Sequence, residues 1–332
     1  MRLPVFDYKE PSSLGEAASL LREYGTDCKI IAGGTDLLPS MKQKLFRPEY
    51  VISLEGISDL DSIGFDEKQG LQIGSMVALS ALENSLTVKE RYPVIREAAH
   101  AVGSPHLRRM GTIGGNLSLD TRCCYYNQSE SWRKSRPRCI KLGGDTCNAV
   151  GGGNKCFAVF SGDLAPALMA LGAEIRLFSH RGERILPLRD YYTGNGAEPL
   201  VRDPDEILIN VKVPPLPQDA FTTYLKFRIR ESIDFPFAGL AAVIHVDKKE
   251  NVCRKASVAI GAVGPKPLDV HEIAEISEGK RLDGRLIEEI SNLARKAAKP
   301  VDNLGSSSEY RRRTIKAFAR TAFQAAIAPY GK

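Results

Sequence analysis

The amino-acid sequence predicts an α+β fold, because helical and strand-like patterns are mixed in it without a regular βαβ rhythm. A proline-rich stretch at 214–217 interrupts these patterns, since proline continues neither a helix nor a strand ladder. Three strand patterns and two helical patterns follow this stretch. We therefore expect three units, at residues 1–55, 56–217 and 218–332.

The first unit should contain one amphipathic helix and two short strands. Ser13 and Glu16 form a capping-box pattern, apolar residues then recur at helical spacing, and Gly25 ends the helix. Short apolar runs predict strands at 28–32 and 50–54. These elements suffice for a small α/β subdomain.

The second unit should mix strands and helices, and the third should be an antiparallel sheet with helices. Strands are expected at 60–65, 71–75, 174–178, 184–188 and 206–213, and helices at 78–86, 93–102 and 163–171. In the third unit, strands are expected at 222–230, 240–246 and 252–263, and helices at 284–298 and 310–327. We interpret the basic run at 311–313 as a solvated or intersubunit face.

The composition is that of a folded protein with several domains. The chain has 332 residues, of which 43% are hydrophobic and 26% charged. No apolar run approaches the ~20 residues of a transmembrane helix, and the first residues lack the apolar core of a secretory signal. We therefore expect a cytoplasmic protein that does not enter a membrane, and seven cysteines in such a protein argue against a disulfide framework.

Two glycine turns, at 32–36 and 112–116, each adjoin an apolar run. Backbone amides beside glycine can approach an anion without interference from Cβ atoms, so the two turns together would suit the pyrophosphate of a dinucleotide. Each turn by itself is more often a plain turn. Neither a Walker A pattern nor a G-x-G-x-x-G fingerprint is present, which disfavours a nucleotide triphosphatase or a Rossmann enzyme.

Four of the seven cysteines, Cys123, Cys139, Cys147 and Cys156, lie in one window with gaps of 15, 7 and 8 residues. These gaps match neither the paired C-x₂₋₄-C of zinc knuckles nor the closely spaced cysteines of bacterial ferredoxins. The spacing leaves an iron–sulfur cluster, zinc and unligated thiols all open. Cys124 could replace Cys123 as a ligand.

The cysteine window also carries most of the net charge. Residues 121–158 contain seven basic and two acidic residues, a net charge of +5 out of +6 for the whole chain. This charge would offset an anionic cluster and would attract an acidic redox partner. We do not expect nucleic-acid binding, because the charge is not spread along a face with interleaved aromatic residues.

Three motifs in this order, at 32–36, 111–117 and 162–168, resemble those of the FAD-binding medium subunits in the xanthine dehydrogenase family of molybdenum enzymes. The likeness covers essentially the whole chain. It implies a two-subdomain FAD-binding domain of the PCMH type, followed by a C-terminal domain with a three-stranded antiparallel sheet and helices. It also implies FAD contacts at Ile31, Ala32, Gly33, Gly34, Thr35, Asp36, Leu37, Thr112, Ile113, Gly114, Gly115, Asn116, Asp163, Leu208 and Lys226.

Within this family, the cysteine window is similar to an insertion in the β subunits of 4-hydroxybenzoyl-CoA reductases. Most other members lack such a segment. The resemblance implies that an insertion at about 121–158 holds a [4Fe-4S] cluster on Cys123, Cys139, Cys147 and Cys156. The segment 104–109 departs from the Gln-Ile-Arg-Asn pattern common ahead of the second turn, and Cys124 is also unexpected.

The resemblance implies an oxidoreductase subunit that transfers electrons and holds no catalytic residues of its own. Its partners would be a large subunit with the molybdenum cofactor and a small subunit with [2Fe-2S] clusters, in a dimer of heterotrimers. Ferredoxin would supply electrons for the reductive dehydroxylation of 4-hydroxybenzoyl-CoA to benzoyl-CoA, in the anaerobic degradation of aromatic compounds. One alternative is a molybdenum hydroxylase or dehydrogenase in which electrons flow outward, from molybdenum to FAD. The other is a non-enzymatic binding module held together by zinc.

Overall fold

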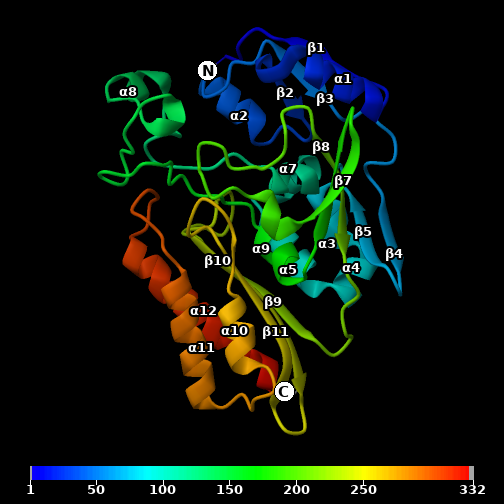
Figure 1. Ribbon diagram of the computed structural model, residues 1–332, viewed down its shortest axis with the longest axis vertical. Helices are drawn as coiled ribbons and strands as arrows, with labels where there is room; N and C mark the ends of the chain where they lie inside the picture. Colours follow the sequence, from blue (N-terminus) through cyan, green and yellow to red (C-terminus); the bar gives the residue numbers. More distant parts are fainter. Residues whose placement is uncertain (1, 329–332) are drawn as a thin grey trace.

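The computed structural model describes residues 2–328, in which three sheets form the framework (Figure 1). The ends of the expected units, residue 1 and residues 329–332, lie outside the described part. The N-terminal sheet has the parallel order β1 (Asp7–Lys9), β3 (Tyr50–Ser53), β2 (Cys28–Ile31). Helix α1 (Leu14–Tyr24) has the expected cap, because the Ser13 hydroxyl accepts a hydrogen bond from the Glu16 N–H.

The second sheet is antiparallel, with the order β4-β5-β8-β6-β7. Ile207 and Ile209 of β8 share a core with α1 and the N-terminal sheet, so the two sheets pack together. The strands are β4 (Ile63–Asp66), β5 (Gly70–Gly74), β6 (Glu174–Ser179), β7 (Gly182–Pro187) and β8 (Ile207–Val213).

Helices pack on the second sheet, and the most buried of them is α9 (Leu164–Ala170), in which all seven residues are buried. The helix expected at 78–86 is divided into two, because Ser85 is extended and its hydroxyl caps the following helix through the Val88 N–H. The remaining helices of this unit are α3 (Leu79–Asn84), α4 (Leu86–Arg91), α5 (Pro93–Ala101), α6 (Pro105–Met110) and α7 (Ile113–Leu117).

The C-terminal sheet has four antiparallel strands in the order β12-β11-β10-β9, so the expectation of three strands was wrong. The additional strand, β12 (Leu268–Asp269), pairs with Ile260 and Ala259, and two residues are too short to produce a periodic sequence pattern. The other strands are β9 (Phe221–Phe227), β10 (Ala238–Asp247) and β11 (Val252–Gly261), and the helices that pack with them are α10 (His271–Ser277), α11 (Gly284–Ala297) and α12 (Ser308–Ile327).

Arg311 at the start of α12 is fully buried, so the interpretation of 311–313 as a solvated or intersubunit face is wrong for this residue, whereas Arg313 is exposed. Its guanidinium donates to the backbone carbonyls of Phe237, Val301 and Ala262. A buried guanidinium needs such acceptors, and loops distant in sequence supply them here. Within residues 2–328, no helix is long and apolar enough to cross a membrane.

Candidate functional site

The first glycine turn leads from β2 into α2 (Leu37–Lys42). Gly34 has φ +68°, a conformation that favours glycine. A Cβ atom on Gly33 would lie only 1.6 Å from the Met110 carbonyl oxygen. The turn therefore packs on the end of α6, and only glycine permits that approach.

The second glycine turn lies directly after this contact, and in the structure it is the N-terminal part of helix α7, with Thr112 as the N-cap. The Thr112 hydroxyl accepts from the Gly115 N–H at 3.1 Å, and a Cβ on Gly114 would lie 2.8 Å from the Ser75 carbonyl oxygen. The Asn116 side chain is buried and accepts from the Leu164 N–H at 3.1 Å, which ties the turn to α9. Because Gly33 packs on Met110 and the turn begins two residues later, the structure brings the two glycine turns together.

Asp163 and Lys226 form a buried ion pair at the start of α9, with 3.0 Å between Oδ2 and Nζ. The Tyr224 hydroxyl donates to the other carboxylate oxygen of Asp163 at 2.7 Å, and Lys226 also donates to the Ala101 carbonyl oxygen at 2.8 Å. Burial raises the pKa of Asp163 and lowers that of Lys226. Leu208 is a core residue of β8, a strand that contacts α7 of the second turn.

Four cysteines line one pocket, and they are the four that the resemblance implied as metal ligands. Cys123, Cys139, Cys147 and Cys156 reach the pocket from separate loop segments, and aromatic and aliphatic side chains complete its wall together with Lys141. Cys124 is exposed and does not line this pocket. The pocket therefore favours Cys123 over Cys124 as the first ligand.

Backbone pairing holds the cysteine loops in place. Arg122, which precedes Cys123, makes an antiparallel bridge with Val159, with N–H···O distances of 2.8 and 2.7 Å. Cys139 makes a parallel bridge with Thr146. Gly144 permits the tight turn between them, since a Cβ there would lie 1.9 Å from the Arg138 carbonyl oxygen.

The C-terminal unit also holds the loops. The buried Asn303 accepts from the Cys124 N–H through its carbonyl oxygen at 2.9 Å. Its side-chain amide donates to the Phe157 carbonyl oxygen at 2.7 Å. One residue thus fixes the chain directly after both Cys123 and Cys156.

The sulfur atoms lie in a mostly buried environment. Burial raises the pKa of Cys123 to about 12 and also raises that of Cys156. The Ala158 N–H donates to the Cys156 sulfur at 3.4 Å. A bound metal ion would hold these two thiols as thiolates, because a metal ion deprotonates its thiol ligands.

The spacing of the thiols bears on which metal centre they fit. Within residues 2–328, no group of three or more His, Cys, Asp or Glu side chains is close enough to hold a single metal ion. A zinc ion needs four ligand atoms at about 2.0–2.3 Å from one point. The four thiols line a common pocket without forming such a group.

An ion pair joins the first glycine turn to the cysteine loops. Arg122 Nη1 lies 2.8 Å from Asp36 Oδ1, and the guanidinium lies over the Phe235 ring at 3.9 Å. Burial raises the pKa of Asp36, although Arg122 opposes this shift. The Asp36 carboxylate therefore depends on Arg122 as its counter-charge.

The helix of the insertion, α8 (Glu130–Lys134), packs on the N-terminal unit next to α2 (Figure 1). Arg133 donates to the carbonyl oxygens of Gln43 and Lys44 at 3.1 and 3.0 Å. Glu130 pairs with Arg47 at 2.6 Å. Part of the basic charge of the insertion therefore serves to attach it to the N-terminal unit.

Sequence reasoning missed the roles of three residues. Arg122 and Lys141 were counted only as parts of a basic window, and Tyr224 was read as a strand residue. Arg122 and Lys141 lie within two residues of Cys123 and Cys139, and that proximity was the available signal. Tyr224 and Lys226 are two residues apart on β9, so both side chains lie on the same face of the strand.

Comparison with known proteins identifies the family. Residues 4–216 match the FAD binding domain of molybdopterin dehydrogenases, and residues 222–326 match the C-terminal domain of CO dehydrogenase flavoproteins. The chain belongs to this family of FAD-binding medium subunits of molybdenum enzymes. The family includes the xanthine dehydrogenases and the CO dehydrogenases.

Individual relatives agree with this assignment. The chain is 30% identical to the carbon monoxide dehydrogenase medium chain of Afipia carboxidovorans, over 97% of both chains. It is 32% identical to the aldehyde oxidoreductase FAD-binding subunit PaoB of Escherichia coli K12, over 83% of this chain and 87% of PaoB. A solved structure of CO dehydrogenase from Oligotropha carboxidovorans superposes with a TM-score of 0.81, 28% identity, and coverage of 98% and 99% of the two chains.

The medium subunit is thus part of an oxidoreductase complex and carries an FAD-binding domain, as the resemblance implied. The alternative of a non-enzymatic binding module is wrong, because the family match covers both halves of the chain.

Proposed function

We propose that this medium subunit holds FAD on its two glycine turns and a [4Fe-4S] cluster on its four pocket cysteines. In this proposal it transfers electrons from ferredoxin to its partner subunits for the reduction of 4-hydroxybenzoyl-CoA to benzoyl-CoA. The observation that supports it most is that Cys123, Cys139, Cys147 and Cys156 line one pocket. The Asp36–Arg122 pair connects that pocket to the first glycine turn.

In the proposal, the FAD pyrophosphate lies on residues 31–37 and 112–116. The first turn supplies the backbone amides, because the N–H groups of residues 113–116 already donate to acceptors within the protein. The close packing of Gly33 on Met110 supports this assignment, since it sets the two turns side by side. The Asp163–Lys226 pair and Leu208 would contact the flavin. The FAD-binding domain would consist of two subdomains at 1–55 and 56–217, with the C-terminal domain at 218–332.

In the proposal, the insertion at about 121–158 holds the cluster. A [4Fe-4S] cluster supplies one-electron chemistry when it is bound. The chain's own residues then provide four thiolates, the Ala158 N–H to the Cys156 sulfur, and the buried Lys141 beside the pocket. In this proposal the chain needs no acid–base residue, since its task is to position cofactors.

The partners in this proposal are a large subunit with the molybdenum cofactor and a small subunit with [2Fe-2S] clusters, in a dimer of heterotrimers in the cytoplasm. The positive charge near the cysteine pocket supports ferredoxin as the electron donor. Arg138 and Lys155 are exposed, and they directly precede the ligands Cys139 and Cys156. An acidic one-electron carrier would therefore meet cations close to the cluster.

The names of the relatives favour a second candidate. Among the similar curated chains are the carbon monoxide dehydrogenase medium chain of Afipia carboxidovorans and the nicotinate dehydrogenase FAD-subunit of Eubacterium barkeri. A dehydrogenase passes electrons outward from substrate to acceptor. The same site would then deliver electrons to ferredoxin instead of accepting them.

Electron flow in the purified complex tests both candidates. The complex is prepared without oxygen and supplied with chemically reduced ferredoxin and 4-hydroxybenzoyl-CoA, and benzoyl-CoA is measured by chromatography. We expect benzoyl-CoA only with reduced ferredoxin, together with stoichiometric FAD and about four irons per medium subunit beyond the [2Fe-2S] content. Iron at the [2Fe-2S] content alone would exclude the cluster. A complex with the cluster that instead reduces ferredoxin with an aldehyde or N-heterocycle would support the second candidate.

A further inference from the structure

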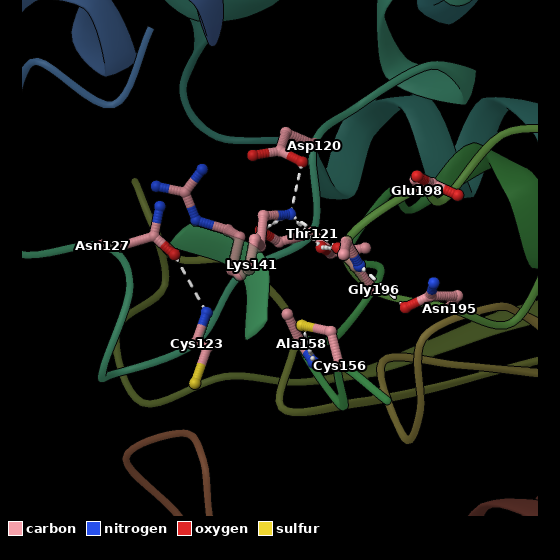
Figure 2. Close-up of polar contacts among 12 residues, drawn as sticks. Asp120, Thr121, Cys123, Asn127, Lys141, Cys156, Ala158, Asn195, Gly196 and Glu198 are labelled. Carbon is pink, nitrogen blue, oxygen red and sulfur yellow. Dashed lines mark hydrogen bonds and ion pairs between the residues drawn. The ribbon is translucent and has the colours of Figure 1, made fainter. Parts of the chain in front are cut away.

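Lys141 is a buried lysine whose ammonium group is surrounded by oxygen atoms. Its side chain is 4% exposed, and Nζ lies 2.6 Å from Asp120 Oδ1 and 2.7 Å from the Gly196 carbonyl oxygen. Thr121 accepts from the same ammonium through its hydroxyl and its carbonyl oxygen (Figure 2). These acceptors account for the donors of the ammonium group and hold it in one position.

Lys141 also forms part of the wall of the cysteine pocket. Lys141 lines this pocket with the four cysteines, and its Nζ lies 4.8 Å from the centre of the buried Tyr126 ring, which also lines it. Gly196, which accepts from Lys141, donates its N–H to the Cys156 carbonyl oxygen at 2.9 Å. Asp120 pairs with Lys141 but does not line the pocket.

We propose that Lys141 sets the reduction potential of the group held by the four cysteines, and that Asp120 partly opposes it. This inference rests on the proposed cluster. Reduction adds one negative charge to the cluster, and a nearby fixed cation stabilises the reduced form more than the oxidised form. Lys141 therefore raises the potential. Asp120 lowers it by less, since Asp120 is bound to the ammonium group but does not line the pocket.

Burial distinguishes Lys141 from the other cations of the insertion. Arg138 and Lys155 also lie next to ligands but are exposed, and salt and water screen exposed charges. The charge of Lys141 is held in a region of lower dielectric, where its effect is stronger. The exposed Arg138 and Lys155 are therefore suited to a partner, whereas the buried Lys141 acts on the cluster.

The test measures the cluster potential by an EPR-monitored redox titration of the oxygen-free complex. The variants are Lys141→Met, which removes the cation at similar length, and Asp120→Asn, which removes the opposing charge at the same shape. Lys134→Met is the matched control, because Lys134 belongs to the same insertion but its side chain is 76% exposed. The flavin and [2Fe-2S] potentials of each sample serve as internal references.

We expect a lower cluster potential in Lys141→Met, a higher one in Asp120→Asn, and no change in Lys134→Met. A structural role for the pair would not produce shifts of opposite sign. If Lys141→Met loses the cluster, the potential measured in Asp120→Asn tests the inference alone. An unchanged or lowered cluster potential in Asp120→Asn overturns the inference. A wild-type complex without cluster iron would instead remove the proposed function, so the two failures are distinguishable.

Discussion

Arg122 Nη1 lies 2.8 Å from Asp36 Oδ1, and this ion pair joins the first glycine turn to the residue before Cys123. Arg122→Gln should therefore weaken the attachment of the insertion. The Asp36 carboxylate then lacks its counter-charge, which should lower the free energy of unfolding by about 1–3 kcal/mol. Chemical denaturation of the complex, followed by release of FAD and iron, measures this effect.

The effect of Arg122→Gln should depend on pH. Burial already raises the pKa of Asp36, and Arg122 lowers it, so loss of Arg122 should raise this pKa further. The deficit in stability relative to wild type should be small in acid, where Asp36 is protonated in both proteins. It should grow as the pH rises through the wild-type pKa of Asp36. The double variant Asp36→Asn/Arg122→Gln should show no such growth, and a pH-independent deficit in Arg122→Gln would refute the pairing.

Gly33→Ala should reduce FAD retention. The added methyl group would overlap the Met110 carbonyl oxygen, which is backbone and cannot rotate away, so the two glycine turns must separate. We expect a loss of about 1–3 kcal/mol in stability and a lower FAD content, measured by absorbance after denaturation. Gly15→Ala is the control, since a Cβ at Gly15 in α1 has no neighbour within 4 Å and should stabilise the helix slightly. Full FAD occupancy in Gly33→Ala would argue against these turns as the phosphate site.

Replacement of single cysteines should separate ligands from non-ligands. Cys139→Ser and Cys156→Ser should abolish the cluster signal and the acid-labile sulfide, because both thiols are buried at the pocket. Cys124→Ser should leave iron and sulfide unchanged, because this thiol is exposed and outside the pocket. Cluster loss in Cys124→Ser, with retention in Cys123→Ser, would reverse the choice of first ligand.

Local signals explain what the sequence could predict. The cap at Ser13, the glycine turns and the clustering of cysteines are all visible within a few residues or one window. Each rests on a short-range rule, such as the acceptance of a helix N–H by a serine hydroxyl. The same rules failed for β12, which pairs over only two residues.

The part of the site that the sequence did not predict depends on contacts between segments that are distant in sequence. Asp36 and Arg122 are 86 residues apart, and Lys141 reaches Gly196 across 55 residues. In the sequence, Arg122, Lys141 and Arg311 are ordinary surface cations. Only the fold surrounds Lys141 and Arg311 with oxygen acceptors, which makes burial of their charge tolerable. A count of basic residues in the sequence therefore overestimates the positive charge on the protein surface, because it includes buried cations such as Lys141 and Arg311.

Lys226→Met should be strongly destabilising, because it leaves Asp163 buried without its counter-charge. Both side chains are at most 5% exposed, and removal of one partner of a buried pair costs about 3–5 kcal/mol. Tyr224→Phe removes only one hydrogen bond to the same carboxylate, so its cost should be smaller, about 1–3 kcal/mol. Lys212→Met is the matched control, since Lys212 is exposed on β8 and should change stability by less than about 0.5 kcal/mol. Urea unfolding of the three variants measures these costs. If Lys226→Met were no more destabilising than Lys212→Met, Asp163 would have to be neutral in the folded protein.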